Sequence, residues 1–385
     1  VQPFAETAFA AHREAGRPIV LATTTPYDLV KPFADRLGLD DVVATRYGVA
    51  ADGTYDGTLD GPFVWSAGKL VAITDWADRH GVDLTESYAY SDSVYDTPML
   101  SAVGHPIVVN PDPRMVLVAA ARRWPTLNLD VSPGVLKIPV IGLELQQIAL
   151  RFARPSAYPY ARFDISGVEH IPSNGAAILV GNHRSYFDVA AMSLTIAEAG
   201  RPARFLGKKE VFDAPVVGPI AAAMGGIRVD RGTGSDEPLA AAVAALEGGE
   251  MVTMMPEGTI PRGPAFFRKP VGRWGAARLA QMTGAPIIPV GVWGTEHVWP
   301  RSSRFPNVLN VTDPPTVRIR VGGPVHQVGR SLEADTKRIM SAIVELLPVD
   351  AYRKRTPTPE ELAATYPPGY TGDPASESER RPGTD

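Results

Sequence analysis

Two residues capable of acid–base chemistry follow an apolar run in the second half of the chain. The stretch ILVGNHRSYFD, residues 178–188, places His183 and Asp188 directly after a buried-strand pattern that ends at Gly181. A carboxylate can hold an imidazole in one tautomer and leave the other ring nitrogen ready to accept a proton. The alternative is a loop histidine beside an acid that the helix dipole favours. Metal binding is the weaker interpretation, because no third ligand has suitable spacing nearby.

The spacing of this pair constrains its local structure. The run NGAAILV predicts a strand and HRSYFDVAAMSLTIAEA predicts a helix. At about 100° per residue, His183 and Asp188 would lie roughly 140° apart on a regular helix. A hydrogen bond between them therefore requires His183 to lie in the turn before the helix.

A second pair of chemical residues lies in the first half, in YSDSVYDTPML. Asp92 and Asp96 are four residues apart, so a helix beginning there would place both carboxylates on one face. Two carboxylates so close suit a hard cation such as Mg²⁺. The alternative is a capped helix start in which Asp96 is solvated.

The elements that position these residues indicate an α/β chain with two domains. Apolar runs alternate with helix-like segments in both halves, as expected for parallel sheets with crossover helices. We expect a first domain over residues 1–124, a linker with an amphipathic helix over 125–159 and a second domain over 160–350. Residues 351–385 are rich in proline, serine and charge, which predicts a disordered tail.

The composition excludes several classes of protein. Of 385 residues none is cysteine, so disulfides, thiolate nucleophiles and Cys-based zinc sites are excluded. The net charge of −4 provides no general basic field for nucleic acid, so we expect no nucleic-acid partner. No apolar run reaches the roughly 18 residues of a spanning helix, which leaves peripheral membrane contact open.

The first half resembles the haloacid dehalogenase-like phosphatases, in the branch that includes phosphoserine phosphatases. The resemblance rests on IVLATTTP, AGKLVAI, YSDSVYD and VGHPIVVNPD, taken in this order. It implies a Rossmannoid fold, in which Thr23 and Lys69 bind phosphate and Asp92 and Asp96 bind Mg²⁺. The first motif of that family, which carries the attacking aspartate, does not precede Thr23. We therefore expect an incomplete, N-terminally truncated domain and no phosphatase turnover from this chain.

The second half resembles the glycerolphosphate acyltransferase family, specifically the 1-acyl-glycerol-3-phosphate acyltransferases. Four blocks carry the resemblance, in order and spacing: NHRSYFD, GKKEVFDAPVVGPIAAAMGGIRVDR, MVTMMPEGTIPRG and GAPIIPVGVWG. It implies that His183 deprotonates the acceptor hydroxyl while Asp188 orients the ring. The acyl donor would be acyl-CoA or acyl carrier protein, the acceptor lysophosphatidate, and no cofactor would be needed.

The same resemblance implies an acceptor site that contains Glu257 and Gly258, although a structural role for Glu257 is a close alternative. Ile260 occupies the position of the family's usual arginine, so Arg262, or Arg228 with Arg231, would bind the phosphate instead. The basic and aromatic run over residues 262–278 suits a phosphate or an anionic bilayer.

The sequence therefore predicts acyl transfer to the sn-2 hydroxyl of 1-acyl-glycerol 3-phosphate, a step of phospholipid synthesis. The chain would be cytoplasmic and peripherally bound to the inner face of the plasma membrane. One alternative is a Mg²⁺-dependent phosphomonoesterase with a lipid-binding second domain. Another is a membrane docking module in which His183 is inert.

Overall fold

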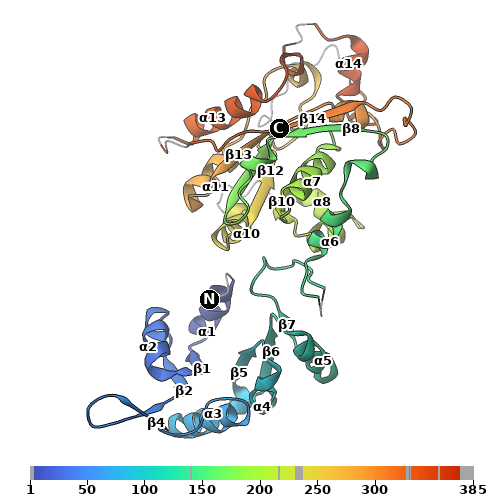
Figure 1. Cartoon of the computed structure of the whole chain (residues 1–385). Helices are drawn as coiled ribbons and strands as arrows, with labels where there is room; N and C mark the ends of the chain where they lie inside the picture. The colour runs from blue at the N-terminus through green and yellow to red at the C-terminus, as the bar shows by residue number, and fades with distance from the viewer. Residues whose placement is uncertain are drawn as a thin grey trace. The chain divides into compact units, whose positions relative to one another are not determined.

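The computed structural model describes residues 4–138, 141–215, 217–229, 237–326, 329, 331–353 and 356–372. The chain forms two compact units, one of residues 1–133 and 137–142 and the other of residues 134–136 and 143–385. Both are mixed α/β (Figure 1). The division falls within the segment expected to be a linker.

The first unit contains short parallel sheets with helices between their strands (Figure 1). Strands β1 and β2 pair in parallel, as do β5, β6 and β7, while β3 and β4 form a separate antiparallel hairpin. The elements are α1 Ala5–Glu14, β1 Val20–Pro26, α2 Tyr27–Arg36, β2 Asp41–Thr45, β3 Tyr47–Val49, β4 Tyr55–Leu59, α3 Ala67–His80, β5 Tyr88–Ser91, α4 Thr97–Ala102, β6 His105–Val109, α5 Pro113–Arg122 and β7 Thr126–Leu127.

The second unit is built on one seven-stranded sheet, in the order β11-β10-β12-β9-β13-β14-β8. The pairs are parallel except β13–β14, which is antiparallel, so β14 and β8 run opposite to the rest. The strands are β8 Arg162–Ser166, β9 Ala177–Gly181, β10 Arg204–Lys208, β11 Ile227–Val229, β12 Met251–Met254, β13 Ile287–Trp293 and β14 Thr316–Val321.

Helices cover both faces of this sheet (Figure 1). One face packs against α10, α11 and α13, and the other against α7. The helices of this unit are α6 Leu145–Phe152, α7 Asp188–Glu198, α8 Lys209–Asp213, α9 Val217–Ala223, α10 Glu237–Glu247, α11 Gly275–Thr283, α12 Thr295–Val298, α13 Leu332–Glu345 and α14 Pro359–Ala364.

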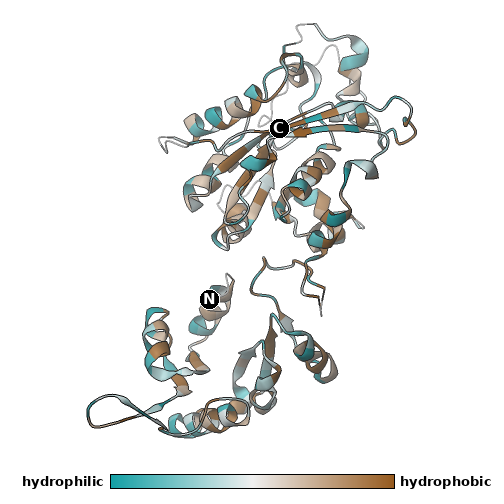
Figure 2. Cartoon of the chain, viewed as in Figure 1, coloured by the Kyte–Doolittle hydropathy of each residue, from teal (hydrophilic) through white to brown (hydrophobic). Residues whose placement is uncertain are grey.

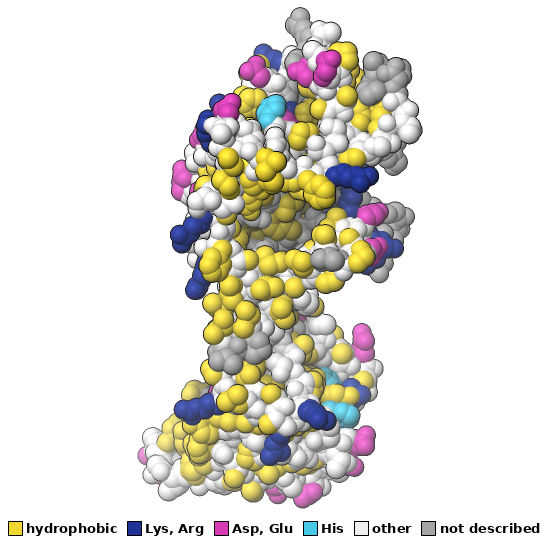
Figure 3. Space-filling view, turned by 90° about the vertical axis from the view of Figure 1, so that its right-hand side faces the viewer, with side chains coloured by type: hydrophobic (Ala, Val, Ile, Leu, Met, Phe, Trp, Pro, Cys, Tyr) yellow, Lys and Arg dark blue, Asp and Glu magenta, His cyan; other side chains and the backbone are white. Residues whose placement is uncertain are grey.

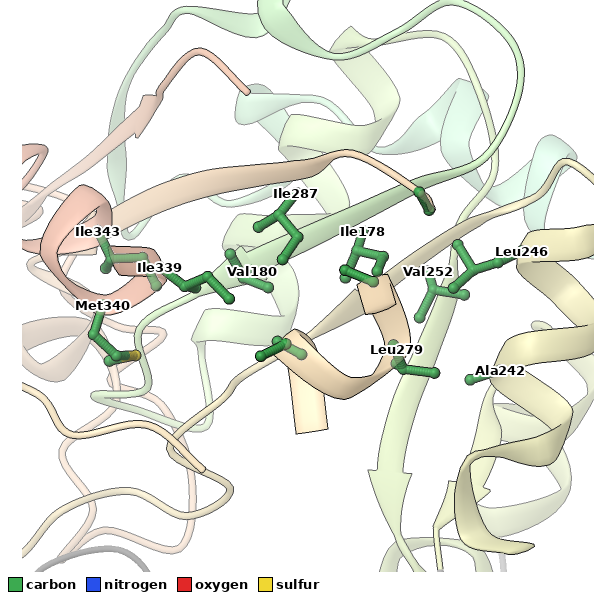
Figure 4. Close-up of a cluster of buried hydrophobic side chains, with 14 of the residues drawn as sticks. Ile178, Val180, Ala242, Leu246, Val252, Leu279, Ile287, Ile339, Met340 and Ile343 are labelled. Carbon is green, nitrogen blue, oxygen red and sulfur yellow. The ribbon is translucent and has the colours of Figure 1, made fainter. Parts of the chain in front are cut away.

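The central strand β9 explains why this sheet is buried on both faces. Its residues are all buried, and successive side chains point to opposite faces. Ile178 and Val180 pack with α10, α11 and α13, as Figure 4 shows, whereas Ala177 and Leu179 pack in the core on the α7 side. Figure 2 shows the strands of this sheet coloured largely as hydrophobic. A strand buried on both faces reads as a continuous apolar run, which is what the sequence showed.

Helix α6, in the segment expected to be a linker, is anchored to the second unit. The buried Gln146 side chain donates to the carbonyl oxygen of Ala203 at 2.8 Å and accepts from its N–H at 3.1 Å. Glu144, at the helix start, pairs with the buried Arg204 at 2.6 Å. These contacts make the helix part of that unit's packing.

The expectation of a disordered tail from residue 351 is wrong for residues 356–372. Helix α14 begins with a capping box at Thr358, in which the side chains of Thr358 and Glu361 satisfy backbone N–H groups. Beyond it, Thr365 Oγ1 accepts a hydrogen bond of 2.7 Å from the N–H of Gly263, and the Tyr366 ring is 2% exposed. The buried Tyr366 ring and the capping box at Thr358 order this segment, although its composition is polar on average. Residues 373–385 lie outside the described residues.

Replacing Tyr366 by alanine should lower the stability of the second unit by about 3 kcal/mol or more, because the deletion of a buried aromatic ring leaves a cavity. Urea denaturation measures this loss. Glu360→Ala, at an exposed position of α14, is the control and should change stability by less than about 0.5 kcal/mol. Equal stabilities for the two variants would show that the segment is not packed as described.

Candidate functional site

Strand β9 delivers His183 to the edge of the sheet where its parallel neighbours also end. Asn182 fixes the strand end, since its side chain donates to the carbonyl oxygen of Val292 at 2.8 Å and accepts from the N–H of Val292 at 2.7 Å. Helix α7 does not begin until Asp188. His183 therefore lies in the turn between strand and helix, as the spacing predicted.

The expected hydrogen bond between His183 and Asp188 is present. His183 Nδ1 lies 2.8 Å from Asp188 Oδ2. Because an ionised carboxylate only accepts, Nδ1 carries the proton and Nε2 keeps its lone pair. The imidazole is 21% exposed, whereas the Asp188 side chain is fully buried. This arrangement can supply a general base at Nε2.

Asp188 organises the whole turn as well as the imidazole. The same Oδ2 accepts the backbone N–H groups of Arg184 at 2.6 Å and Ser185 at 2.8 Å. Oδ1 accepts the Thr295 hydroxyl at 2.5 Å, which connects the turn to α12. Four donors thus converge on one buried carboxylate and compensate its desolvation.

Glu257, in the turn after β12, contacts the same histidine from a neighbouring strand end. Strand β12 pairs with β9, which brings Glu257 Oε1 to 2.7 Å from the backbone N–H of His183. Glu257 is 1% exposed, and its Oε2 has no hydrogen-bond partner among the residues that the structure describes. The side chain therefore positions the backbone of His183. The next residue, Gly258, has φ +74°, a left-handed conformation that favours glycine.

The surroundings of Glu257 favour its neutral form. Burial raises the pKa of this carboxyl to about 8. The hydrogen bond from the His183 N–H and the charge of Arg184 lower this pKa, but their effect is smaller than that of burial. The nearby charge of Asp188 adds to the rise. At neutral pH Glu257 is therefore mainly protonated.

This pKa predicts how stability depends on pH. Between about pH 4.5 and pH 8 the folded protein keeps the Glu257 proton while the unfolded chain has lost it, so stability falls as pH rises through this window. The expected slope is at most roughly 1.4 kcal/mol per pH unit, and it disappears above the folded-state pKa. Glu257→Gln removes this titration, and urea denaturation across the window should show a flatter curve. Glu198→Gln, at an exposed position, should keep the wild-type slope, whereas equal slopes in all three proteins would contradict the buried neutral acid.

A small cavity lies beside His183. It is lined by Asn182, Glu257 and Leu347, together with Arg184, Phe266 and Arg268, and its volume is about 10 Å³, room for about one water molecule. Arg184 is already engaged: its Nε donates to Glu296 at 2.7 Å and its Nη1 to the carbonyl oxygen of Ala351 at 3.0 Å. Its guanidinium also lies 4.2 Å from the centre of the Phe266 ring.

The two predicted phosphate-binding arginines that the structure describes, Arg228 and Arg262, do not meet at His183. Arg228, on β11, is exposed and pairs with Asp213 at 2.9 Å, and neither Arg228 nor Arg262 lines the cavity of His183. Arg231 lies outside the described residues. Arg268 lines the cavity instead. It belongs to the basic run noted in the sequence, but its position depends on the short 3₁₀ turn Gly263–Phe267, which the sequence did not predict.

Ile260, at the position where the sequence resemblance leads us to expect an arginine, is 4% exposed and packs inward. Its carbonyl oxygen accepts a hydrogen bond of 2.6 Å from Arg301 Nη1. The Ile260 side chain therefore packs in the interior of the unit. The guanidinium that contacts this position comes from Arg301 in another segment of the chain.

In the first unit, the predicted phosphatase-like residues come together only in part. Lys69, in the first turn of α3, and Asp96 form a buried ion pair of 2.7 Å, and Ser91 Oγ also donates to Asp96. The expectation that Asp92 and Asp96 share a helical face is wrong, because residues 94–96 form a 3₁₀ turn and α4 begins only at Thr97. Asp92 is exposed while Asp96 is buried.

Thr23 lies in β1, where its hydroxyl donates to Thr25 Oγ1 at 3.1 Å. Within the described ranges, no group of three or more His, Asp or Glu side chains could hold a metal ion. In this structure Asp96 pairs with Lys69 while Asp92 is exposed, so a Mg²⁺ site at these two carboxylates stays a prediction.

Two family models match this chain. Residues 162–293 match the acyltransferase model, and residues 1–101 match the model of haloacid dehalogenase-like hydrolases. The chain is 30% identical over 198 residues to a chloroplastic 1-acyl-sn-glycerol-3-phosphate acyltransferase of Brassica napus, covering 50% of this chain and 53% of that protein.

Relatives of the first region include phosphatases. A phosphoserine phosphatase of Mycobacterium tuberculosis is 37% identical over 129 residues, covering 34% of this chain and 42% of that protein. A Streptomyces azureus protein named "Inhibition of morphological differentiation protein" is 43% identical over 117 residues, covering 30% of this chain and 42% of that protein. The chain thus spans about half or less of the length of these relatives. The expected lack of phosphatase turnover gains no support from them.

Among solved structures, the 1-acyl-sn-glycerophosphate acyltransferase of Thermotoga maritima is similar with a TM-score of 0.38 and 20% identity, covering 52% of this chain and 80% of that one. A protein of unknown function from Bordetella pertussis has a TM-score of 0.31 and 36% identity, covering 32% of this chain and 56% of that one.

Proposed function

We propose that this chain, in which an acyltransferase region follows a haloacid dehalogenase-like region, transfers a fatty acyl group from a thioester to lysophosphatidate. The observation that carries the proposal is the hydrogen bond between His183 Nδ1 and the buried Asp188, which leaves Nε2 as a base beside a cavity. The similarity to a 1-acyl-sn-glycerol-3-phosphate acyltransferase supports the choice of acceptor.

In the proposed reaction, His183 Nε2 accepts the proton of the acceptor's sn-2 hydroxyl as its oxygen attacks the thioester carbonyl carbon. The carbon–sulfur bond then breaks, and the CoA thiolate leaves and takes up the proton from the imidazolium. The products are phosphatidate and CoA. Because the acceptor hydroxyl is itself the nucleophile, the reaction needs no cysteine or serine of the protein.

Asp188 and Glu257 act on this step through His183. Asp188 holds the imidazole in the required tautomer, and Glu257 holds the backbone of His183. Arg268, which lines the same cavity, is the cation best placed to meet the acceptor's phosphate. We keep Arg228 and Arg262 as candidates for a more distant part of that site.

The cavity of about 10 Å³ admits no lipid as it stands. The proposal therefore requires movement of the segment that lines it, residues 261–270, when the acceptor enters. This segment is held by contacts to the C-terminal part of the unit, including that of Gly263 with Thr365.

The proposed acceptor is a lipid, so the reaction would take place at a membrane surface, which we place at the cytoplasmic face. In the second unit, several large apolar side chains are exposed, among them Phe152, Val217, Ile220, Phe305 and Leu309. On one face of this unit, hydrophobic side chains gather around a hollow (Figure 3). Among the described residues, none of the helices has the length and hydrophobicity needed to cross a bilayer.

An acceptor comparison tests the proposal. CoA release from oleoyl-CoA should occur with lysophosphatidate and be much slower with glycerol 3-phosphate or lysophosphatidylcholine, which lack the acyl chain or the exposed phosphate monoester. CoA release with glycerol 3-phosphate alone would still support acyl transfer but would contradict lysophosphatidate as the acceptor. Absence of release with all three, from folded protein supplied with vesicles, would overturn the proposal and favour a docking module.

A second candidate function is phosphomonoester hydrolysis, because the first region matches hydrolases and its relatives include a phosphoserine phosphatase. Release of inorganic phosphate from phosphoserine that depends on Mg²⁺ and disappears in Asp92→Asn would establish it.

A further inference from the structure

A second and larger cavity lies on the sheet of the second unit, away from the residues discussed so far. Its volume is about 310 Å³, and its lining includes Gly291 and Trp293 of β13, Arg318 and Arg320 of β14, and residues 346–348 after α13. This volume is within the range of ligand sites, roughly 300 to 1,000 Å³. No sequence motif in the chain pointed to it.

The pairing of two strands creates this cavity. In the antiparallel register of β13 and β14, Trp293 lies opposite Arg318 and Gly291 lies opposite Arg320. Val317 and Ile319 point to the buried core on the other face, so the alternation of the strand places both arginines on the cavity side. At Gly291 a Cβ atom would lie 2.7 Å from Leu346 Cβ, so glycine permits the end of α13 to pack there.

The two arginines differ in how they are engaged. Arg320 is held by Asp164, with a contact of 2.6 Å between Nη2 and Oδ2. Arg318 is exposed, and its guanidinium lies 5.1 Å from the centre of the Trp293 ring. Within the described part of the chain, neither the Arg318 guanidinium nor the Trp293 indole N–H has a hydrogen-bond acceptor. The cavity therefore presents unused donors beside an apolar wall of residues 346–348, which suits an anion attached to a flat or apolar group.

This cavity adjoins the one that contains His183. Leu347 lines both cavities. The side chain of Asn182, directly before His183, is hydrogen-bonded to Val292, directly before Trp293. A long ligand bound at Arg318 could therefore extend a flexible arm to the imidazole.

We propose that the Arg318 cavity binds the phosphorylated nucleoside end of the acyl donor, an inference that rests on the proposed acyl transfer from CoA. The phosphate meets the Arg318 guanidinium, which matches phosphate geometry with two N–H groups. The nucleoside lies against Trp293 and the apolar wall, and the thioester arm runs past Leu347 to His183. The cavity thereby selects CoA over a donor that lacks the nucleotide.

Calorimetric titration of the full chain with adenosine 3′,5′-bisphosphate tests this inference. The wild type should bind this nucleotide, and Arg318→Ala should bind it about tenfold more weakly, the effect of removing one charge-assisted hydrogen bond. Because Arg318 makes no hydrogen bond to the described residues, the variant should fold normally. The matched control is Arg162→Ala on strand β8, which removes an exposed arginine of the same sheet face outside the cavity and should bind as the wild type does.

Three results would overturn the inference: no binding of the nucleotide by the wild type, equal binding by Arg318→Ala, or a loss in Arg318→Ala of glycerol 3-phosphate binding alone. The last result would assign the cavity to the acceptor's phosphate. In turnover, Arg318→Ala should raise KM for oleoyl-CoA by a similar factor and leave kcat unchanged.

The two proposals can fail separately, because binding of the nucleotide requires no acyl transfer. Arg318-dependent binding without turnover on any acceptor would support this cavity and overturn the proposed function. Turnover that depends on His183, with the same KM for oleoyl-CoA in the wild type and in Arg318→Ala, would support the proposed function and overturn the assignment of this cavity.

Discussion

Replacing His183 by alanine should lower the rate of acyl transfer by at least about a hundredfold, because general-base catalysis typically contributes roughly 10² to 10⁴ in rate. The variant should remain folded, since the substitution removes a single side-chain hydrogen bond, the one to Asp188, and the ring is partly exposed. The measurement is kcat for CoA release from oleoyl-CoA with lysophosphatidate.

The matched control for this variant is His326→Ala, which removes an exposed histidine of the same unit outside the cavity. It should retain the wild-type rate. A folded His183→Ala protein with a rate within a few-fold of the wild type would show that the imidazole is not the base.

Asp188→Asn should lower kcat nearly as much as His183→Ala, because Asp188 acts on the reaction only through the imidazole. An amide at this position can no longer accept from every donor that meets the carboxylate, so the Nδ1–H tautomer loses its fixed partner. The same change should reduce stability by about 1 to 3 kcal/mol, the cost of a buried donor without an acceptor.

The double variant shows whether Asp188 acts through His183 or independently of it. If the carboxylate acts through His183, then His183→Ala combined with Asp188→Asn should be about as slow as His183→Ala alone. Losses that multiply in the double variant would mean that Asp188 has a separate role in turnover. Glu198→Gln, at the exposed end of α7, should leave both stability and rate unchanged.

The part of the site that could be predicted from the sequence is the part that depends on local structure. The apolar run before Gly181 and the angular separation of His183 and Asp188 were sufficient to place the histidine in a turn before a helix. The strand, the turn and the start of the helix are continuous in the chain, so spacing alone determines which side chains can meet.

Contacts between distant segments could not be predicted in this way. Glu257 reaches the backbone of His183 only because β12 is the neighbour of β9 in the sheet, and no local pattern gives strand order. For the same reason the sequence did not single out Arg268 over Arg262, since the 3₁₀ turn between them decides which one faces the cavity.

Two expectations failed because average composition or ideal spacing was applied to short segments. The carboxylates of Asp92 and Asp96 would share a face on an α-helix, but a 3₁₀ turn separates them and Lys69 neutralises one. The segment around α14 is polar on average, yet Tyr366 is buried and orders it. In each case one specific contact outweighed the local tendency.

The most direct test of the central claim is a paired measurement of phosphatidate formed and CoA released from oleoyl-CoA and lysophosphatidate, in the wild type and in His183→Ala. The wild type should form one phosphatidate for each CoA, and the folded variant should form neither product above background. CoA release without phosphatidate would show thioester hydrolysis instead of acyl transfer. Equal formation of phosphatidate by both proteins would contradict the assignment of His183 as the base.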